Sequence, residues 1–393
     1  MKPILLTLSL SLLLPFSSAL AETWSAPIEQ LRKVGREGAG NNEAAAAWNA
    51  LTALGSEMLV PVLAAMDGSS PLARNWMRTA VETVFDRELR AGKSLPGDAI
   101  KAFVLDRNNE PNARRLAFDL YLKLDPDDAA ALIPGFADDP SPALRRDAVA
   151  KLLAEGKTQL EAGARDQSLA TLRKALDAAR DADQIDAVTK LLREKLEEKV
   201  DLPKHFGFLS HWHLIAPFDN TGRAGFDKPF PPESSIDLTA RYEGKDGKPV
   251  TWQEYATPDD YGKVDFNQPF GPLKEVTGYA YTEFNAAEAR DAELRLGCKN
   301  AWKIWFNGEL LFGRDEYHRG QRIDQYSLPV KLNKGKNTLL VKACQNEQTQ
   351  DWTVQWEFQL RVCDATGTAI LATDRKPTPE KSAPVRRRPN REN

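Results

Sequence analysis

The sequence contains little of several residue types that define whole classes of protein. Its 393 residues include only three cysteines, four histidines and four methionines. So few cysteines exclude a small domain that is stabilised by many disulfide bonds. The 53 Lys and Arg residues nearly balance the 56 Asp and Glu residues, so the net charge of −3 gives no general reason to expect nucleic-acid binding. A hydrophobic content of 42% excludes a chain that is disordered throughout.

Long apolar runs are also scarce, and the one at the start predicts a signal peptide. Lys2 precedes an apolar run over residues 4–16, which is shorter than the ~20 residues that a membrane-spanning helix needs. Ala19-Leu20-Ala21 then gives the small-x-small pattern of a cleavage site. We therefore expect residues 1–21 to be removed and the protein to be exported, to the periplasm or outside the cell, without a transmembrane segment. The alternative is an uncleaved membrane anchor.

The three cysteines, Cys298, Cys344 and Cys363, all lie in the C-terminal half. Two arrangements remain open: one disulfide bond with one free thiol, or three free thiols that are buried like other small apolar side chains. No Cys-x-x-Cys pair points to catalytic thiol chemistry.

The composition changes near residue 203. Residues 40–200 are rich in Ala and Leu, which favour helix, whereas 24 of the 33 aromatic residues lie between Phe206 and Phe358, where they favour strand. Pro203 cannot continue a preceding helix and marks the boundary. These patterns predict a multidomain fold with a helical domain over residues 22–200 and a β domain over residues 203–372.

The helical half carries a weak internal repeat. Pro71, Pro111 and Pro142 each fit the first turn of a helix and are each followed three residues later by arginine. Ser70 and Ser141 are expected to cap two of these helices. This half resembles HEAT repeats, most closely over residues 138–153, and the resemblance implies an α-solenoid that binds a protein partner, such as an envelope protein. The alternative is an irregular helical bundle.

The C-terminal half reads as a series of short strands. Asn307-Gly308 between two apolar runs predicts a β-hairpin, because both turn positions need a positive φ. Apolar and polar residues alternate over residues 353–362, which predicts a strand with one buried face and one face in solvent. Many short strands in one region predict an antiparallel β-sandwich or jelly roll.

Residues 300–310 and 332–342 resemble galactose-binding-like jelly rolls, which include carbohydrate-binding modules. The likeness covers residues 205–372. Residues 212–220 are similar to a lead-in segment of exported bacterial proteins that join helical repeats to such a sandwich. The resemblance implies a galactose-binding-like sandwich with a polysaccharide as its ligand, and it leaves open whether a structural Ca²⁺ is bound. No other cofactor is expected.

Sugar binding requires aromatic rings for stacking and planar polar groups for the hydroxyls. Two loops, residues 314–322 and 345–352, contain this mixture. We expect Tyr317 and Trp352 to stack on a glycan. The hydrogen-bonding groups are expected to be Arg314, Arg322 and Asn346. The alternative is that the aromatic side chains only close the core.

Other site chemistries find less support in the residues. His211 and His213 share one face of a strand, but no third ligand is evident, so no metal site is expected. Loop carboxylates such as Asp259 and Asp260 leave a polysaccharide-acting enzyme as a third hypothesis. The first hypothesis is an exported binding protein without catalytic residues, and the second is a protein–protein adaptor that binds no sugar.

The C-terminal segment, residues 373–393, contains four prolines and an excess of basic residues without apolar periodicity. This composition predicts a disordered tail. Its positive charge would suit an acidic polysaccharide or an anionic lipid surface.

Overall fold

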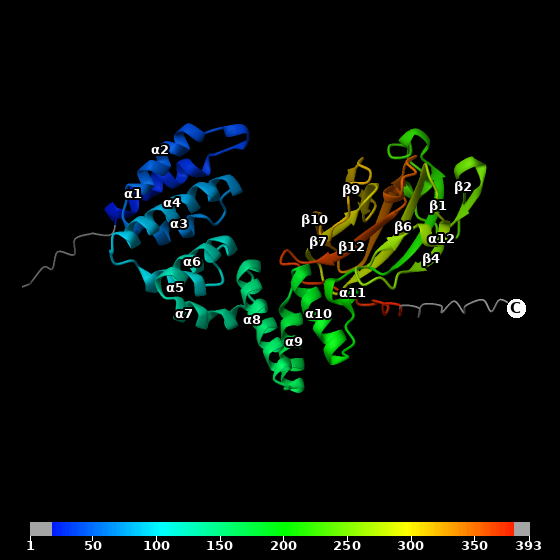
Figure 1. The fold of residues 1–393 in the computed structure, drawn as a ribbon. Helices are drawn as coiled ribbons and strands as arrows, with labels where there is room; N and C mark the ends of the chain where they lie inside the picture. Colours follow the sequence, from blue (N-terminus) through cyan, green and yellow to red (C-terminus); the bar gives the residue numbers. More distant parts are fainter. Residues whose placement is uncertain (1–17, 381–393) are drawn as a thin grey trace, which may run out of the picture. The chain divides into compact units, whose positions relative to one another are not determined.

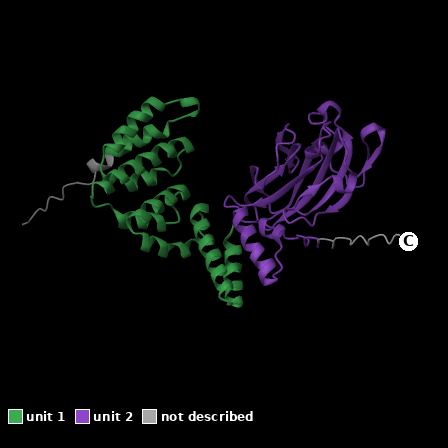
Figure 2. Cartoon of the chain, viewed as in Figure 1, with its two compact units in different colours: residues 1–179 green, residues 180–393 purple. Residues whose placement is uncertain are grey.

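The computed structural model describes residues 18–380 (Figure 1). Most of the predicted signal peptide, residues 1–17, and the last part of the predicted tail, residues 381–393, lie outside the described residues. The chain divides into two compact units, residues 1–179 and 180–393 (Figure 2). Within residues 18–380, no helix has the length and apolar character needed to cross a membrane.

The described part of the first unit is helical, as its Ala- and Leu-rich composition predicts. Its α-helices are α1 (Ser18–Arg32), α2 (Asn41–Thr52), α3 (Leu59–Ala65), α4 (Pro71–Arg90), α5 (Gly97–Leu105), α6 (Pro111–Leu124), α7 (Pro126–Leu132), α8 (Pro142–Glu161) and α9 (Arg165–Ala178).

The predicted helix starts at Pro71, Pro111 and Pro142 are confirmed, because α4, α6 and α8 begin at these residues. The Ser70 side chain accepts a hydrogen bond from the Ala73 backbone N–H at 3.2 Å, so its predicted capping role is also confirmed. Ser141 makes no such bond; its hydroxyl donates to the Pro111 carbonyl instead, at 3.1 Å.

Two of the three arginines that follow these prolines connect one helix start to the next. Arg74 on α4 pairs with Glu110, the residue before α6, at 2.6 Å. Arg114 on α6 donates two hydrogen bonds, both of 2.8 Å, to Asp139, which lies shortly before α8. The repeated sequence pattern therefore has a repeated structural role. It joins the start of α4 to that of α6, and the start of α6 to that of α8.

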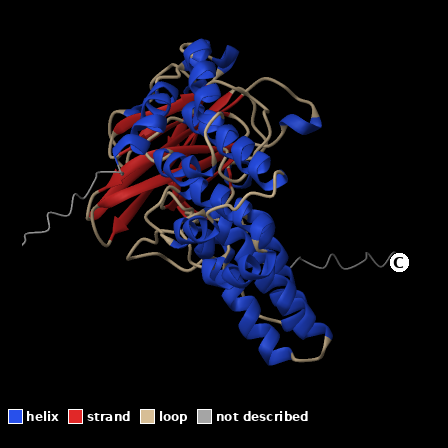
Figure 3. Cartoon of the chain, turned by 90° about the vertical axis from the view of Figure 1, so that its left-hand side faces the viewer, coloured by secondary structure: helices blue, strands red, loops and turns tan. Residues whose placement is uncertain are grey.

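The strands of the described residues, red in Figure 3, all lie in the second unit. They are β1 (His211–Asp219), β2 (Arg241–Glu243), β3 (Pro249–Thr251), β4 (Gln253–Ala256), β5 (Val264–Asp265), β6 (Val276–Ala286), β7 (Arg290–Cys298), β8 (Ala301–Phe306), β9 (Glu309–Arg314), β10 (Tyr326–Leu332), β11 (Gly335–Gln345) and β12 (Glu357–Cys363). The unit also contains α10 (Ala182–Leu196), α11 (Leu202–Phe206) and α12 (Asn267–Phe270).

Two antiparallel sheets form a β-sandwich in this unit. The six-stranded sheet has the order β4-β1-β6-β11-β8-β9, and the four-stranded sheet has the order β10-β7-β12-β5. Side chains of both sheets share one core, with Trp212 and Val341 from the larger sheet and Leu360 from the smaller one. A separate two-stranded sheet pairs β2 with β3.

The larger sheet is buried on its second face as well. Ile215, Tyr279 and Leu340 form a second cluster there with Phe230 and Trp252 from the segment between β1 and β6. Apolar residues therefore occur at consecutive positions of β1 and β11 instead of alternating, as expected of strands that are covered on both faces.

The predicted Asn307-Gly308 hairpin is confirmed: it joins β8 to β9, and both residues have a positive φ. The prediction for residues 353–362 was wrong in part. The strand begins only at Glu357, and Gln359 and Arg361 are buried instead of facing solvent. Arg361 is covered because it donates hydrogen bonds to the carbonyl groups of Phe206 and Gly367.

Two other features complete the second unit. Its three cysteines, Cys298, Cys344 and Cys363, are free and buried. Of the two predicted arrangements, the structure therefore has three free thiols and no disulfide bond between them. Helix α10, which the sequence analysis assigns to the helical half, belongs to this unit. Arg193 on α10 donates to the Asp260 carboxylate at 3.0 Å, beside the sandwich.

Candidate functional site

Strand register brings several loops together at one end of the six-stranded sheet. Asp219 at the end of β1 pairs with Val276 at the start of β6, and Val276 pairs with Gln345 at the end of β11. Next to β11, β8 begins, and its Trp302 pairs with Arg314 at the end of β9. The loops that leave these strands carry four of the five predicted glycan-binding residues.

Trp352 is the most exposed large apolar side chain of the second unit, with 57% of its surface accessible, whereas the other tryptophans of this unit are buried. It lies in a short 3₁₀ turn, Asp351–Thr353. The ring of His318 contacts Trp352 edge-on, with 5.4 Å between ring centroids. The exposed indole ring of Trp352 is therefore supported by the ring of His318.

The turn that carries Trp352 is fixed by buried polar groups. The hydroxyl of Thr353, which is fully buried, donates to the carbonyl groups of Gln348 and Gln350 at 2.9 and 2.7 Å. The Thr353 carbonyl accepts hydrogen bonds of 2.9 Å from the side chains of Lys274 and Gln345. These hydrogen bonds constrain the backbone of the turn that carries the exposed indole.

Asn346 holds His318 in place. Its amide oxygen lies 2.9 Å from His318 Nε2, and its amide nitrogen donates to Gln348 at 3.1 Å. Burial lowers the pKa of His318, so the ring is neutral at pH 7. Asn346 is fully buried, so it positions the His318 ring and offers no polar group at the surface.

Tyr317 lies beside His318 and is half-buried. Its hydroxyl accepts a hydrogen bond of 3.2 Å from Asn220, and the guanidinium group of Arg223 lies 5.2 Å from its ring centroid. Arg223 is paired with Glu347 at 2.5 Å. Burial raises the pKa of Tyr317, so its hydroxyl stays protonated. Tyr317, His318, Asn346 and Trp352 are called the Trp352 platform below.

The two predicted arginines are not part of this platform. Arg314 is exposed at the end of β9, where its nearest acidic partner is Glu316 at 3.8 Å. Arg322 is exposed over the four-stranded sheet, where its carbonyl oxygen approaches Gly297 of β7 so closely that a methyl group would collide with it. The structure therefore brings Tyr317, Asn346 and Trp352 together and leaves both arginines apart.

The sequence analysis did not single out the residues that support the platform, namely His318, Asn220, Arg223, Lys274 and Thr353. Only His318 could have been found from local sequence, because it follows Tyr317 in a loop already selected. Thr353 follows Trp352 directly, but its burial and its hydrogen bonds are not visible in the sequence. Asn220, Arg223 and Lys274 come from segments that are distant in sequence, so only the folded sheet relates them to Trp352.

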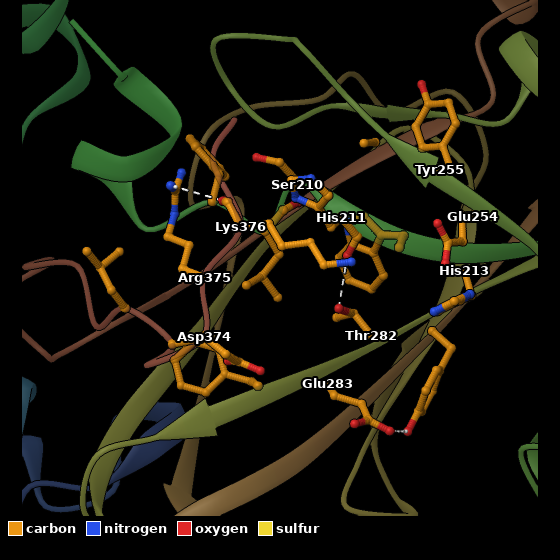
Figure 4. A pocket seen from close by; sticks show the side chains of 18 of the residues that line it. Ser210, His211, His213, Glu254, Tyr255, Thr282, Glu283, Asp374, Arg375 and Lys376 are labelled. Atoms are coloured by element: carbon orange, nitrogen blue, oxygen red, sulfur yellow. Dashed lines mark hydrogen bonds between the residues drawn. The ribbon is translucent and has the colours of Figure 1, made fainter. Parts of the chain in front are cut away.

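A pocket of about 570 Å³ lies at the opposite end of β1 and is called the β1 pocket (Figure 4). Its lining comes from residues 207–213, Leu238, Glu254–Ala256, 281–284, 370–372 and 374–376. His211 and His213 are both part of this lining. Across the described ranges, no group of three or more His, Cys, Asp or Glu side chains could hold a metal ion.

The loop carboxylates that suggested an enzyme have structural partners. Asp260 accepts hydrogen bonds from Arg193 at 3.0 and 3.1 Å. Asp259 accepts from the backbone N–H of Tyr261 at 2.8 Å and so stabilises its own loop.

No protein-family model matches the sequence, and no curated protein matches it. Similar solved structures include a family 35 carbohydrate-binding module from Clostridium thermocellum, with 17% identity, 23% of this chain and 72% of that chain covered, and a TM-score of 0.17. A β-glucosidase from Kluyveromyces marxianus has 15% identity over 23% of this chain and 11% of its own length, with a TM-score of 0.19. The PA14 domain of the MpAFP antifreeze protein has 11% identity over 24% of this chain and 48% of its own, also with a TM-score of 0.19. TM-scores this low do not establish a shared fold.

Proposed function

We propose that this chain is an exported, non-catalytic binding protein whose β-sandwich binds a glycan on the Trp352 platform. The observation that carries the proposal is the exposed indole of Trp352, held by His318 and by a turn whose backbone is bonded to buried side chains. A sugar ring presents an apolar face that stacks on such an indole. Since the turn is already fixed, binding would lose little conformational entropy.

The finer features of the fold are part of the same proposal. The sandwich would be a galactose-binding-like jelly roll, and the helical unit a HEAT-like solenoid that binds an envelope protein. The repeated connection of Arg74 to Glu110 and of Arg114 to Asp139 supports the solenoid, because repeat proteins reuse the same contacts between neighbouring units. Export rests on the cleavage pattern at Ala19-Leu20-Ala21.

The test is affinity electrophoresis and titration calorimetry of the full chain against neutral and acidic polysaccharides, with and without Ca²⁺. We expect saturable binding to at least one polysaccharide. Trp352→Ala should abolish it, because stacking on one aromatic ring contributes much of the binding energy at such sites.

The matched control is Leu310→Ala, which removes another exposed apolar side chain from the same sandwich but from β9. It should bind as the unchanged protein does. If the folded protein binds no polysaccharide in the panel, the glycan proposal fails, and the adaptor hypothesis is then tested by capture of partners on the helical unit. If Leu310→Ala weakens binding as much as Trp352→Ala, the site lies elsewhere.

A further inference from the structure

The β1 pocket is separate from the Trp352 platform. It lies at His211, where β1 begins, whereas the platform lies beyond Asp219, where β1 ends. A strand of nine residues separates them by roughly 26 Å, at the ~3.3 Å that each residue of a strand spans. The pocket volume of about 570 Å³ lies in the range of about 300–1,000 Å³ that small-molecule sites occupy.

One wall of the pocket is the C-terminal segment, residues 370–376, which is fixed at two places. The Thr373 N–H donates to the Asn285 carbonyl of β6 at 2.8 Å. The Arg375 guanidinium group lies 3.6 Å from the Asp201 carboxylate, just before α11. The following residue, Lys376, is thereby held at the pocket, and Figure 4 shows it reaching from this segment toward His211.

Five charged side chains other than histidine line the pocket, and three of them have partners. Glu283 pairs with Lys336 at 2.5 Å and accepts a hydrogen bond of 2.8 Å from Tyr281. Asp374 accepts from the Asn285 amide at 2.6 Å. Arg375 donates to Thr378 at 2.9 Å in addition to its contact with Asp201.

The other two, Lys376 and Glu254, form no hydrogen bond or ion pair through their side chains with any described residue. Both line the pocket together with His211, and Glu254 pairs across the strands with His213. Burial has the largest effect on the pKa of His211 and lowers it, the positive charge of Lys376 lowers it further, and Glu254 opposes this. The pocket lining therefore contains one unpaired ammonium group and one unpaired carboxylate, together with the neutral imidazole of His211.

Apolar side chains also line the pocket, next to its polar groups. Leu238 and Leu371 line the pocket and are 37% and 36% exposed, and Tyr255 and Ile370 are also part of its lining. The hydroxyl oxygen of Ser210, also in the lining and 95% buried as a residue, has no hydrogen-bond partner in the structure. A ligand that fits this surface combines an apolar body with opposite charges.

We propose that the β1 pocket binds a small zwitterionic ligand of the amino-acid or dipeptide class, with its carboxylate at Lys376 and its ammonium group at Glu254. An apolar ligand side chain packs against Leu238 and Leu371. Each unpaired charge then gains a charge-assisted hydrogen bond. This site is independent of glycan binding on the Trp352 platform.

The test is titration calorimetry of the full chain with three probes: the dipeptide Leu-Leu, its N-acetyl derivative and its C-terminal amide. Leu-Leu should bind at least about tenfold more tightly than either derivative, since each derivative lacks one charge. In Glu254→Gln the N-acetyl derivative should no longer be disfavoured. In Lys376→Met the amide should no longer be disfavoured.

Glu309→Gln and Lys331→Met are the matched controls, because both change exposed charges on strands outside the pocket. They should leave the affinities for all three probes unchanged. Trp352→Ala should leave them unchanged too, so that a failure of the glycan proposal is recognised separately. Equal affinity for the three probes, or no binding of any by the folded protein, overturns this proposal.

Discussion

The guanidinium group of Arg114 and the carboxylate of Asp139 form a bidentate ion pair with both hydrogen bonds at 2.8 Å, and both side chains are buried almost completely. Asp139 also accepts the Ser141 backbone N–H at 2.7 Å, directly before α8. One carboxylate therefore joins α6 to the start of α8 in the interior of the helical unit.

Asp139→Ala should lower the free energy of unfolding by about 3–5 kcal/mol, because it leaves the Arg114 guanidinium group buried without a counter-charge. Urea unfolding followed by circular dichroism measures the change. Asp138→Ala is the control: Asp138 pairs with Arg107 at the surface, so its loss should cost less than about 1 kcal/mol. Equal effects of the two variants would contradict a special role for the buried pair.

A second buried charge lies on the outer face of the six-stranded sheet. Lys342 is fully buried and donates to the Phe226 carbonyl at 3.0 Å, the Lys228 carbonyl at 2.9 Å and the Glu233 carboxylate at 2.8 Å. These bonds hold the segment that follows β1 over the sheet.

Lys342→Met should therefore destabilise the protein by about 3–5 kcal/mol, since it removes the counter-charge of the largely buried Glu233 carboxylate and leaves that carboxylate only its hydrogen bond from Tyr279. It should also expose residues 226–233 to proteolysis under native conditions. Lys336→Met, which breaks an exposed pair with Glu283, should cost less than about 1 kcal/mol and leave the cleavage pattern unchanged. A Lys342→Met protein with unchanged stability would show that the apolar contacts suffice.

Acid should weaken the contact between Asp324 and two arginines. Burial favours the neutral form of Asp324, but hydrogen bonds and charge from Arg361 and then Arg295 outweigh it and lower the pKa of the carboxyl below its ordinary 3.8. Because this pKa is lower in the folded chain than in the unfolded chain, the ion pairs contribute stability above pH 3.8, and this contribution disappears as the pH falls through the lowered pKa.

The prediction is that the stability difference between the unchanged protein and Asp324→Asn is largest near neutral pH and shrinks below about pH 4. Urea unfolding at a series of pH values measures it. A difference that stays constant from pH 7 to pH 3 would show that the carboxylate charge is not what stabilises this contact.

The three thiols should react slowly in the folded protein. Burial raises the pKa of Cys298 to about 12 and that of Cys344 and Cys363 to about 11, so little reactive thiolate exists at pH 8. A thiol reagent should modify all three cysteines only in urea. Rapid modification of any one without denaturant, or recovery of fewer than three thiols in urea, would contradict the buried free arrangement.

Local sequence signals predicted the elements whose geometry is set within a few residues. Pro71, Pro111 and Pro142 start helices because proline fits the first turn, and Asn307-Gly308 forms its hairpin because both residues accept a positive φ. The loop of Trp352 could be selected for the same reason, because its aromatic and amide residues are adjacent in sequence.

The features that the sequence did not reveal depend on contacts between distant segments. Arg361 alternates with apolar residues as a solvent-facing residue would, yet the backbone of Phe206 and Gly367 covers it. Arg322 follows Tyr317 closely, but it lies over the other sheet. The β1 pocket could not be predicted because Glu254, Lys376 and His211 come from distant segments and line one pocket only after folding.

The bond between Thr378 and Asp201, 2.9 Å long, also has a consequence for how the β-sandwich is connected. Lys199 and Glu380 lie 3.7 Å apart beside it, so the chain leaves the sandwich where it entered. A domain whose two ends are close together can be inserted into a surface loop of another protein with little distortion of that protein. A short linker between the two ends would also permit a circular permutation of the strands. The two ends of the β-sandwich domain therefore lie close together in space.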